Sequence, residues 1–258
     1  MKACYLHANA GRNVPCWFGC KGTCELAIAG SRRRRPIDNG AAAFPWQLPW
    51  IVNGGDYWDG QYGITIAGAG VSDWKSMIQA RSFTQGTDAN RPAYASGVIT
   101  FDGVDNFLKT DAFTLASPFT VLLAFKQITW ADNDYIFDGN TGNTGTLRQA
   151  NAGASPQLEI RGSVVAGNFN GDLAIDTYGI VTALFNGVSS LLKVNLATSV
   201  TTSVGTADPG GITLGASGVN SLFSNIAVKG MCYAASALTA AQIEQTVRAM
   251  ARRYAVSV

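Results

Sequence analysis

The sequence is poor in the residues on which most enzyme active sites depend. It contains one histidine, His7, and three glutamates, Glu25, Glu159 and Glu244. A Ser-His-Asp or Cys-His system would therefore have to take its base from the N-terminal segment. The sequence also lacks a glycine-rich phosphate loop followed by lysine and serine or threonine, so P-loop nucleotide chemistry is not indicated. We expect no cofactor.

Charged residues and long apolar runs are also scarce. Charged residues make up 14% of the chain, too few for long exposed helices with paired charges, whereas 29 glycines suit short strands joined by turns. No apolar run reaches the roughly 18 residues needed to span a membrane. The first residues, MKACYLHANAGRNVPC, lack the apolar core of a secretory signal. We therefore expect neither a membrane span nor export by the usual route.

Basic charge and cysteine are concentrated near the N-terminus. Residues 1–35 contain seven basic residues and one acid, and the rest of the chain is mildly acidic. Four of the five cysteines lie in the same segment: Cys4, Cys16, Cys20 and Cys24. Their spacing leaves metal-bound thiolates, one or two disulfides, and free thiols open as alternatives. The fifth, Cys232, lies in an apolar stretch and is expected to be a small buried core residue.

Two features of residues 1–63 indicate attachment to a partner. The run SRRRRP supplies four cationic side chains that would bind an acidic surface: Arg32, Arg33, Arg34 and Arg35. Nucleic acid is the less favoured partner, because no aromatic residues are interleaved with the arginines. The segment FPWQLPW adds Trp46 and Trp50, which would either cover the rest of the protein or dock into a partner. We predict that residues 1–63 form an N-terminal arm and attachment segment.

From residue 64 to residue 258 the pattern predicts an all-β domain. Short apolar segments such as VITF and FTVLLAFK are separated by turn residues at intervals of roughly 8–12 residues, which is typical of an antiparallel β-sandwich. An Asn-Gly signal at residues 186–187 predicts a hairpin. In FDGVDNFL, Asp102-Gly103 is interpreted as a turn, because aspartate bonds its own backbone and glycine accepts positive φ.

One helix is expected, over residues 239–255 at the C-terminus. Thr239 is a good N-cap, and Gln242 three residues later completes a capping box. The apolar residues recur along one helical face: Ile243, Val247, Met250 and Tyr254. This stripe predicts a helix that lies against the sandwich.

Several segments resemble a known fold family. FDGVDNFLKT, ITLGASGVN and LTAAQIEQTVRAMARRYAV, with Ser72-Asp73-Trp74 and Arg91-Pro92 upstream, resemble the concanavalin A-like, laminin-G-type jelly-roll domains of bacteriophage virion proteins and bacterial surface proteins. The resemblance implies two curved antiparallel sheets but no single activity. Hydrolytic members carry an E-x-D-x-x-E pattern, which Glu159 in EIRGSV does not begin. We therefore expect a protein that is not an enzyme, unless two distant aspartates meet in a cleft.

The segment WADNDYIFDGNTGNTG, residues 130–145, is the best candidate for ligand binding. Trp130 and Tyr135 would offer flat apolar faces to a sugar ring. Polar partners would come from the side chains between and after them: Asp132, Asp134, Asn140 and Asn143. Such oxygens also suit Ca²⁺. The simpler interpretation is that NTGNTG is only a hairpin turn, for which asparagine and glycine are the expected residues.

These observations favour a non-enzymatic bacteriophage structural, decoration or fibre-type protein. Its jelly roll would be displayed on the virion and attached through the N-terminal arm, after assembly in the host cytoplasm. The expected partners are other virion proteins and copies of itself, with a host-surface glycan as a second ligand. The alternative is a carbohydrate-binding adhesion module of a bacterial surface protein, with the 130–145 segment as its site.

Overall fold

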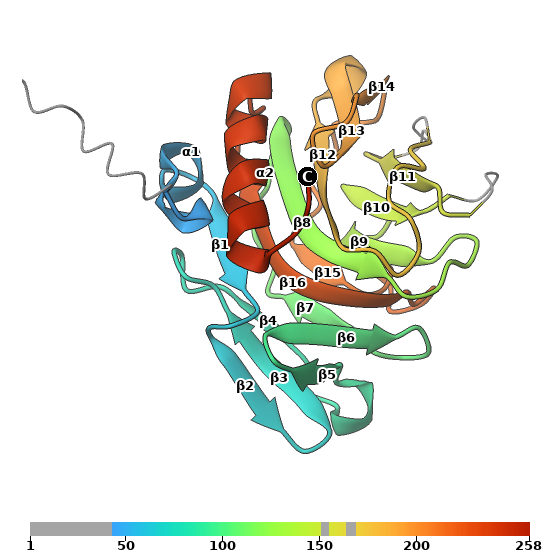
Figure 1. Cartoon of the computed structure of the whole chain (residues 1–258). Helices are drawn as coiled ribbons and strands as arrows, with labels where there is room; N and C mark the ends of the chain where they lie inside the picture. The colour runs from blue at the N-terminus through green and yellow to red at the C-terminus, as the bar shows by residue number, and fades with distance from the viewer. Residues whose placement is uncertain (1–42, 151–154, 164–168) are drawn as a thin grey trace, which may run out of the picture. The chain divides into compact units, whose positions relative to one another are not determined.

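The structure is a computed structural model that describes residues 43–150, 155–163 and 169–258 (Figure 1). In this part the chain is mainly β, with two antiparallel sheets and one long helix at the C-terminus. The prediction of an all-β protein with a C-terminal helix is therefore confirmed. A compact unit runs from residue 42 to residue 258. Residues 32–35 and the first four cysteines lie outside the described residues.

The first sheet has eight strands. They are β1 (Asp56–Asp59), β5 (Ala93–Ala95), β6 (Val98–Asp102), β8 (Phe119–Gln127), β12 (Gly179–Phe185), β13 (Ser190–Val194), β14 (Val200–Thr202) and β16 (Asn225–Ala234). Their order is β14-β13-β12-β8-β16-β6-β5, and β1 pairs with β16 beyond the end of β6. The predicted hairpin at residues 186–187 joins β12 to β13, and Gly187 has a φ of 55°.

The second sheet also has eight strands, again paired antiparallel. They are β2 (Ile64–Ala67), β3 (Gly70–Lys75), β4 (Ser82–Thr84), β7 (Leu108–Thr110), β9 (Tyr135–Gly139), β10 (Thr146–Gln149), β11 (Leu158–Arg161) and β15 (Ile212–Leu214). Their order is β11-β10-β9-β15-β7-β4-β3-β2. Cross-strand partners align one polar row on this sheet: Asp73, Thr84, Lys109, Thr213 and Asp138. Partners in register share a face, so this row lies on the side of the sheet that is turned away from the core.

The FDGVDNFL segment forms a turn, as predicted, but not a hairpin. Asp102 Oδ1 accepts hydrogen bonds from the backbone N–H groups of Val104, Asp105 and Asn106, at 2.9, 3.3 and 3.4 Å. Gly103 has a φ of 76°. The turn carries the chain from β6 in the first sheet to β7 in the second. The sequence did not indicate this change of sheet, because alternation of apolar residues does not specify which sheet a strand joins.

Strand β8 explains how the two layers and the helix share one core. Its Val121, Leu123 and Phe125 pack between the two sheets, whereas Leu122 and Ala124 belong to the cluster beneath the C-terminal helix. Side chains alternate between the faces of a strand. A strand that is covered on both faces must therefore be apolar throughout, which accounts for the run FTVLLAFK.

The C-terminal helix α2 (Ala240–Tyr254) covers the outer face of the first sheet (Figure 1). The Thr239 side chain accepts a hydrogen bond from the Gln242 N–H at 3.3 Å, and Gln242 Oε1 accepts from the Thr239 N–H at 2.8 Å, which confirms the capping box. Ile243, Val247 and Met250 are buried, as is Tyr254. Burial of four such side chains contributes at most about 6–12 kcal/mol to stability.

Residues 43–63, the described part of the segment before residue 64, belong to the same compact unit. Two short helices, η1 (Pro45–Gln47) and α1 (Pro49–Val52), precede β1 and pack into the cluster beneath α2. The boundary predicted at residue 64 therefore lies inside this unit, after the strand that pairs with β16. Two further short helices are η2 (Asp88–Asn90) and η3 (Gly187–Ser189). In the described part of the chain, no helix is long and apolar enough to cross a membrane.

Candidate functional site

Three loops meet around Tyr135, the first residue of β9: residues 128–134, 140–145 and 217–224. The Tyr135 N–H donates to the carbonyl of Leu222 at 2.9 Å, and Tyr135 forms an isolated bridge with Phe223. Its hydroxyl donates to Asn143 Oδ1 at 2.6 Å. The residue is only 4% exposed. Tyr135 therefore contributes to the frame of this loop cluster and not to its surface.

The backbone of the loop cluster adopts conformations that most residues avoid. Asn133, Asn143, Asn220 and Leu222 have φ values of 71°, 55°, 58° and 55°. They are four of nine non-glycine residues with positive φ in the described part of the chain. Asparagine tolerates this region, but leucine does so only at a cost. Backbone strain of this kind persists where surrounding contacts impose it, and it is concentrated at functional sites.

Asp138 supplies the contacts that hold two of these loops. Its Oδ1 accepts hydrogen bonds from the Gly139 N–H and from the Thr146 hydroxyl, and its Oδ2 accepts from the N–H groups of Asn143 and Gly218 at 3.0 and 2.9 Å. The side chain is buried, and burial raises its pKa although the four hydrogen bonds act in the opposite direction. In the sequence, Asp138 is only the aspartate of a second FDG triplet, at residues 137–139, and nothing in that pattern indicates that it holds two loops.

A buried ion pair positions the 128–134 loop. Arg148 Nε and Nη2 donate to Glu159 Oε2 at 3.0 and 2.8 Å, and the side chains are 3% and 0% exposed. Arg148 Nη1 donates to Asn133 Oδ1 at 2.7 Å and so fixes the left-handed residue at the centre of the 128–134 loop. Glu159, the glutamate considered above as a catalytic acid, is thus committed to Arg148.

The exposed part of the loop cluster carries three of the predicted residues. Trp130 is half-buried, and its Nε1 donates to the Gln157 carbonyl at 3.0 Å, which fixes the indole ring. Asp132 is exposed and Asp134 is half-buried, and neither carboxylate has a partner within the described residues. Burial, and secondly the charge of Asp132, raise the pKa of Asp134 to about 6. The loop therefore presents an oriented aromatic ring beside two hydrogen-bond acceptors.

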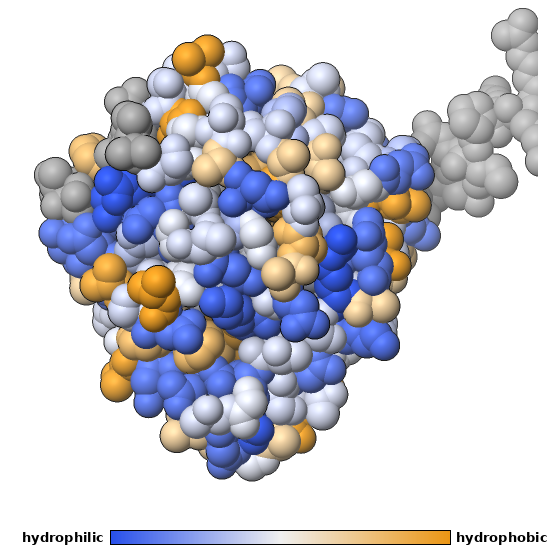
Figure 2. All heavy atoms as spheres, turned by 180° about the vertical axis from the view of Figure 1, so that it is seen from behind, coloured by the Kyte–Doolittle hydropathy of each residue, from blue (hydrophilic) through white to orange (hydrophobic). Residues whose placement is uncertain are grey.

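The 217–224 loop of the same cluster carries exposed apolar side chains. Val219 is 72% exposed, and Leu222 is 47% exposed. Figure 2 shows the molecule from behind, where the surface is mainly hydrophilic and apolar residues form small separate groups. A loop cluster that combines exposed apolar residues with a few unpartnered polar groups has the usual composition of a ligand-binding surface.

Asn140 is placed differently from the other predicted residues. Its Nδ2 donates to the Thr110 carbonyl at 2.9 Å, and its Oδ1 accepts from the Thr213 hydroxyl at 3.0 Å. The two polar atoms thus tie the end of β9 to β7 and β15. The NTGNTG segment does form the loop of the β9–β10 hairpin. Among the described residues, no group of three or more histidine, cysteine, aspartate or glutamate side chains is arranged to hold a metal ion.

The two predicted docking tryptophans contact their own chain. The Trp46 ring stacks on Phe44 at 4.6 Å and lies 5.5 Å from the guanidinium carbon of Arg253. Trp50 Nε1 donates to the Thr246 hydroxyl on α2 at 3.0 Å. Both rings remain partly exposed. Cys232 is a free, fully buried thiol, as predicted, and burial raises its pKa well above the usual range.

Comparison with protein-family models finds no match, and no curated protein sequence is significantly similar. Solved structures do match. A Trypanosoma rangeli sialidase superposes with a TM-score of 0.55 at 12% identity, over 79% of this chain and 33% of the sialidase chain. The same sialidase in complex with sialic acid gives 0.54 at 10% identity, with the same coverage. A binding domain of botulinum neurotoxin serotype D/C gives 0.42 at 13% identity, over 59% and 43% of the two chains, which is too low to indicate a shared fold.

The chain spans about a third of the length of the sialidase chains that it matches, and at this identity the likeness shows the fold alone. The likeness contradicts the prediction that this protein is not an enzyme, because the chains that share its fold are sialidases, which are enzymes. The missing E-x-D-x-x-E pattern excludes only one arrangement of carboxylates. Asp132 and Asp134 provide a different arrangement, which the sequence argument did not test.

Proposed function

We propose that this chain is a carbohydrate-binding β-sandwich of the concanavalin A-like, laminin-G jelly-roll type, and that its binding surface is the loop cluster around Tyr135. The observation that carries the proposal is Asp134. Its half-buried carboxylate has no partner within the described residues, although burying an unbonded charged group is costly. A ligand that donates hydrogen bonds would satisfy it.

Sugar hydroxyls supply such donors, and the C–H face of a sugar ring packs on an aromatic face such as that of Trp130. Arg148 and Arg161 both pair with Glu159, so these three side chains carry one net positive charge, and Asp132 and Asp134 together outweigh it when both are ionised. The net negative charge favours neutral or amino sugars over acidic ones. The likeness to chains described as sialidases supports a role linked to carbohydrate and does not specify the sugar.

The proposed setting of the domain is a bacteriophage virion. Support comes from the sequence: a basic, cysteine-containing N-terminal segment precedes a charge-poor, mildly acidic body. Residues 1–42 would attach the domain to other virion proteins or to further copies of itself. The alternative setting is a bacterial surface protein that uses the same domain for adhesion.

Truncation tests the attachment. Because β1 belongs to the first sheet, the deletion should end at residue 42, so that the sandwich is left intact. The truncated chain should remain folded but fail to co-sediment with purified particles. Co-sedimentation equal to that of the full chain would exclude attachment through residues 1–42.

Two variants test the glycan surface. Trp130→Ala and Asp134→Asn should each weaken retention on an immobilised bacterial polysaccharide by about tenfold, which corresponds to the loss of one good hydrogen bond or stacking contact. Asp172→Asn and Tyr62→Ala, which alter exposed residues outside the three loops, serve as controls. Unchanged retention in both test variants would exclude this surface as the binding site.

Glycoside hydrolysis at the same surface is a second candidate. Asp134, with its pKa raised to about 6, would hold a proton for the leaving oxygen in mildly acidic solution, and Asp132 would be the second carboxylate. Release of reducing sugar that disappears in both Asp132→Asn and Asp134→Asn would establish it. Binding without release of sugar would show that the loop cluster binds glycan but does not hydrolyse it.

A further inference from the structure

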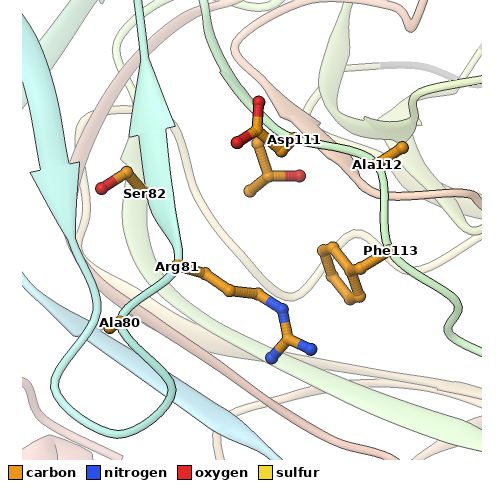
Figure 3. A pocket seen from close by; sticks show the side chains of 7 residues that line it. Ala80, Arg81, Ser82, Asp111, Ala112 and Phe113 are labelled. Carbon is orange, nitrogen blue, oxygen red and sulfur yellow. The ribbon is translucent and has the colours of Figure 1, made fainter.

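A cavity of about 280 Å³ lies between the start of β4 and the segment that follows β7 (Figure 3). Residues 80–82 and 110–113 line it. The Arg81 side chain extends toward the Phe113 ring, and Asp111 lies on the same segment as Phe113 (Figure 3). None of these residues belongs to the three loops around Tyr135. The cavity therefore stands independently of the function proposed above.

Arg81 is held firmly through one of its three nitrogens. Nη1 donates to the Tyr233 hydroxyl at 2.7 Å and to Gln79 Oε1 at 2.8 Å. The guanidinium carbon lies 4.4 Å from the centroid of the Phe113 ring, within the range of a cation–π contact. Nε and Nη2 have no partner within the described residues, and the side chain is 28% exposed. Arg81 therefore retains a pair of adjacent N–H donors for a ligand.

A buried carboxylate positions this arginine. Asp56 is fully buried, its Oδ1 accepts from the Gln79 N–H at 3.2 Å, and its Oδ2 lies 3.6 Å from Arg81 Nη1. Gln79 Nε2 donates to the Gly55 carbonyl at 2.9 Å, so the loop before β4 is fixed at both its backbone and its side chain. The next residue, Ala80, lines the cavity with a φ of 56°. This geometry is imposed before any ligand arrives, which lowers the cost of binding.

The charges around the cavity select the class of ligand. Asp111 is exposed and has no partner within the described residues, so it offers free acceptor oxygens beside the free donors of Arg81. A cation would meet Arg81, and an anion would meet Asp111. A neutral polyhydroxyl compound can use both, since one hydroxyl donates to the carboxylate and another oxygen accepts from the guanidinium.

We infer that this cavity is a binding site for one neutral sugar ring, the Arg81 site. Its volume lies at the lower limit for small-molecule pockets, about 300 Å³, and therefore suits a single ring and not an oligosaccharide. Phe113, whose ring contacts the Arg81 guanidinium and stacks on Tyr233, lines the cavity and contributes apolar surface for the C–H groups of the sugar ring. Arg81 donates to sugar oxygens and Asp111 accepts from sugar hydroxyls, while Asp56 orients Arg81 without touching the sugar.

The test is ligand-observed NMR in a Trp130→Ala/Asp134→Asn background, in which sugar binding at the loop cluster should be weakened by about a hundredfold. Methyl glucoside, methyl galactoside and methyl mannoside are the neutral probes, and glucuronic acid and glucosamine are the charged ones. At least one neutral glycoside should bind at millimolar concentration. Asp111→Asn, a change at an exposed side chain that leaves the fold intact, should weaken it by about tenfold. Asp172→Asn should have no effect.

Three results would overturn the inference. One is the absence of binding by every neutral probe. Another is equal binding in Asp111→Asn and in its parent. The third is a preference for glucuronic acid that increases in Asp111→Asn, which would make the Arg81 site an anion site. The background already carries the substitutions that weaken binding at the loop cluster. A negative result in this test therefore does not bear on glycan binding by that cluster, and a negative result for the cluster does not invalidate this test.

Discussion

Replacement of Asp138 by asparagine tests whether one carboxylate holds the loop cluster together. The side chain is 1% exposed and accepts four hydrogen bonds, two at each oxygen. Asparagine keeps one oxygen and replaces the other with an NH₂ group, which cannot accept. If the oxygen stays with Gly139 and Thr146, the N–H groups of Asn143 and Gly218 face a donor and lose their acceptor.

The magnitude follows from those two N–H groups. Each buried donor left without an acceptor costs about 1–3 kcal/mol, so the loss is about 2–6 kcal/mol. Part of it is offset, because the neutral amide avoids the desolvation that raises the pKa of Asp138. We expect a net loss of about 3 kcal/mol, which lowers the melting temperature of a domain of this size by roughly 6–12 °C.

Calorimetry at neutral pH measures the loss, and hydrogen exchange locates it. Exchange should accelerate at the amides of Asn143 and Gly218 more than at those of β8. Asp208→Asn is the control, since Asp208 is exposed and accepts from the N–H groups of Leu115 and Gly210 through one oxygen, which asparagine retains. If Asp138→Asn is no less stable than Asp208→Asn, the carboxylate does not hold the loops.

Three further changes test other parts of the structure. Glu159→Gln leaves the buried guanidinium of Arg148 without its counter-charge and should cost about 3–5 kcal/mol in urea unfolding, whereas a loss below about 1 kcal/mol would show that the pair does not position the loop. The raised pKa of Asp134 favours its protonated form in the folded state, so unfolding free energy should fall as pH rises from about 4 to 6, and Asp134→Asn should reduce that slope. The same slope in the variant would assign it to another group. Thr239→Ala should cost about 1 kcal/mol through loss of the helix cap, and no change in thermal stability would mean that the cap is dispensable.

The elements that sequence predicted well are those with local causes. Helix α2 begins after Thr239 because the capping box satisfies the first N–H groups, and both signals lie within four residues of sequence. The turn in FDGVDNFL likewise has a local signal, in Asp102 and Gly103. Neither signal shows that β6 and β7 lie in different sheets, since that depends on pairing with strands far along the chain.

The parts of the site that sequence missed depend on pairing between strands. Arg148 and Glu159 are eleven positions apart and meet because β10 and β11 align them in register. In the sequence, Glu159 is an isolated acid, and Arg148 is an isolated base with no helical or turn spacing to a partner. The contact between Arg148 and Asn133, which fixes the loop, depends in turn on that pairing.

Three aspartates within one short segment show why function could be predicted here only in outline. Asp132, Asp134 and Asp138 are equivalent as sequence, although only Asp132 and Asp134 were among the residues for which the segment was singled out. After folding, Asp138 accepts four hydrogen bonds and belongs to the frame, whereas Asp134 accepts none within the described residues. A ligand binds to groups that the fold leaves unsatisfied, and which groups remain so is decided by strand register and loop packing across the whole domain. Glycan binding that is lost in Asp134→Asn but retained in the Asp172→Asn control, with both variants folded, would show that the aspartate left without a partner by the fold is the one that binds the ligand.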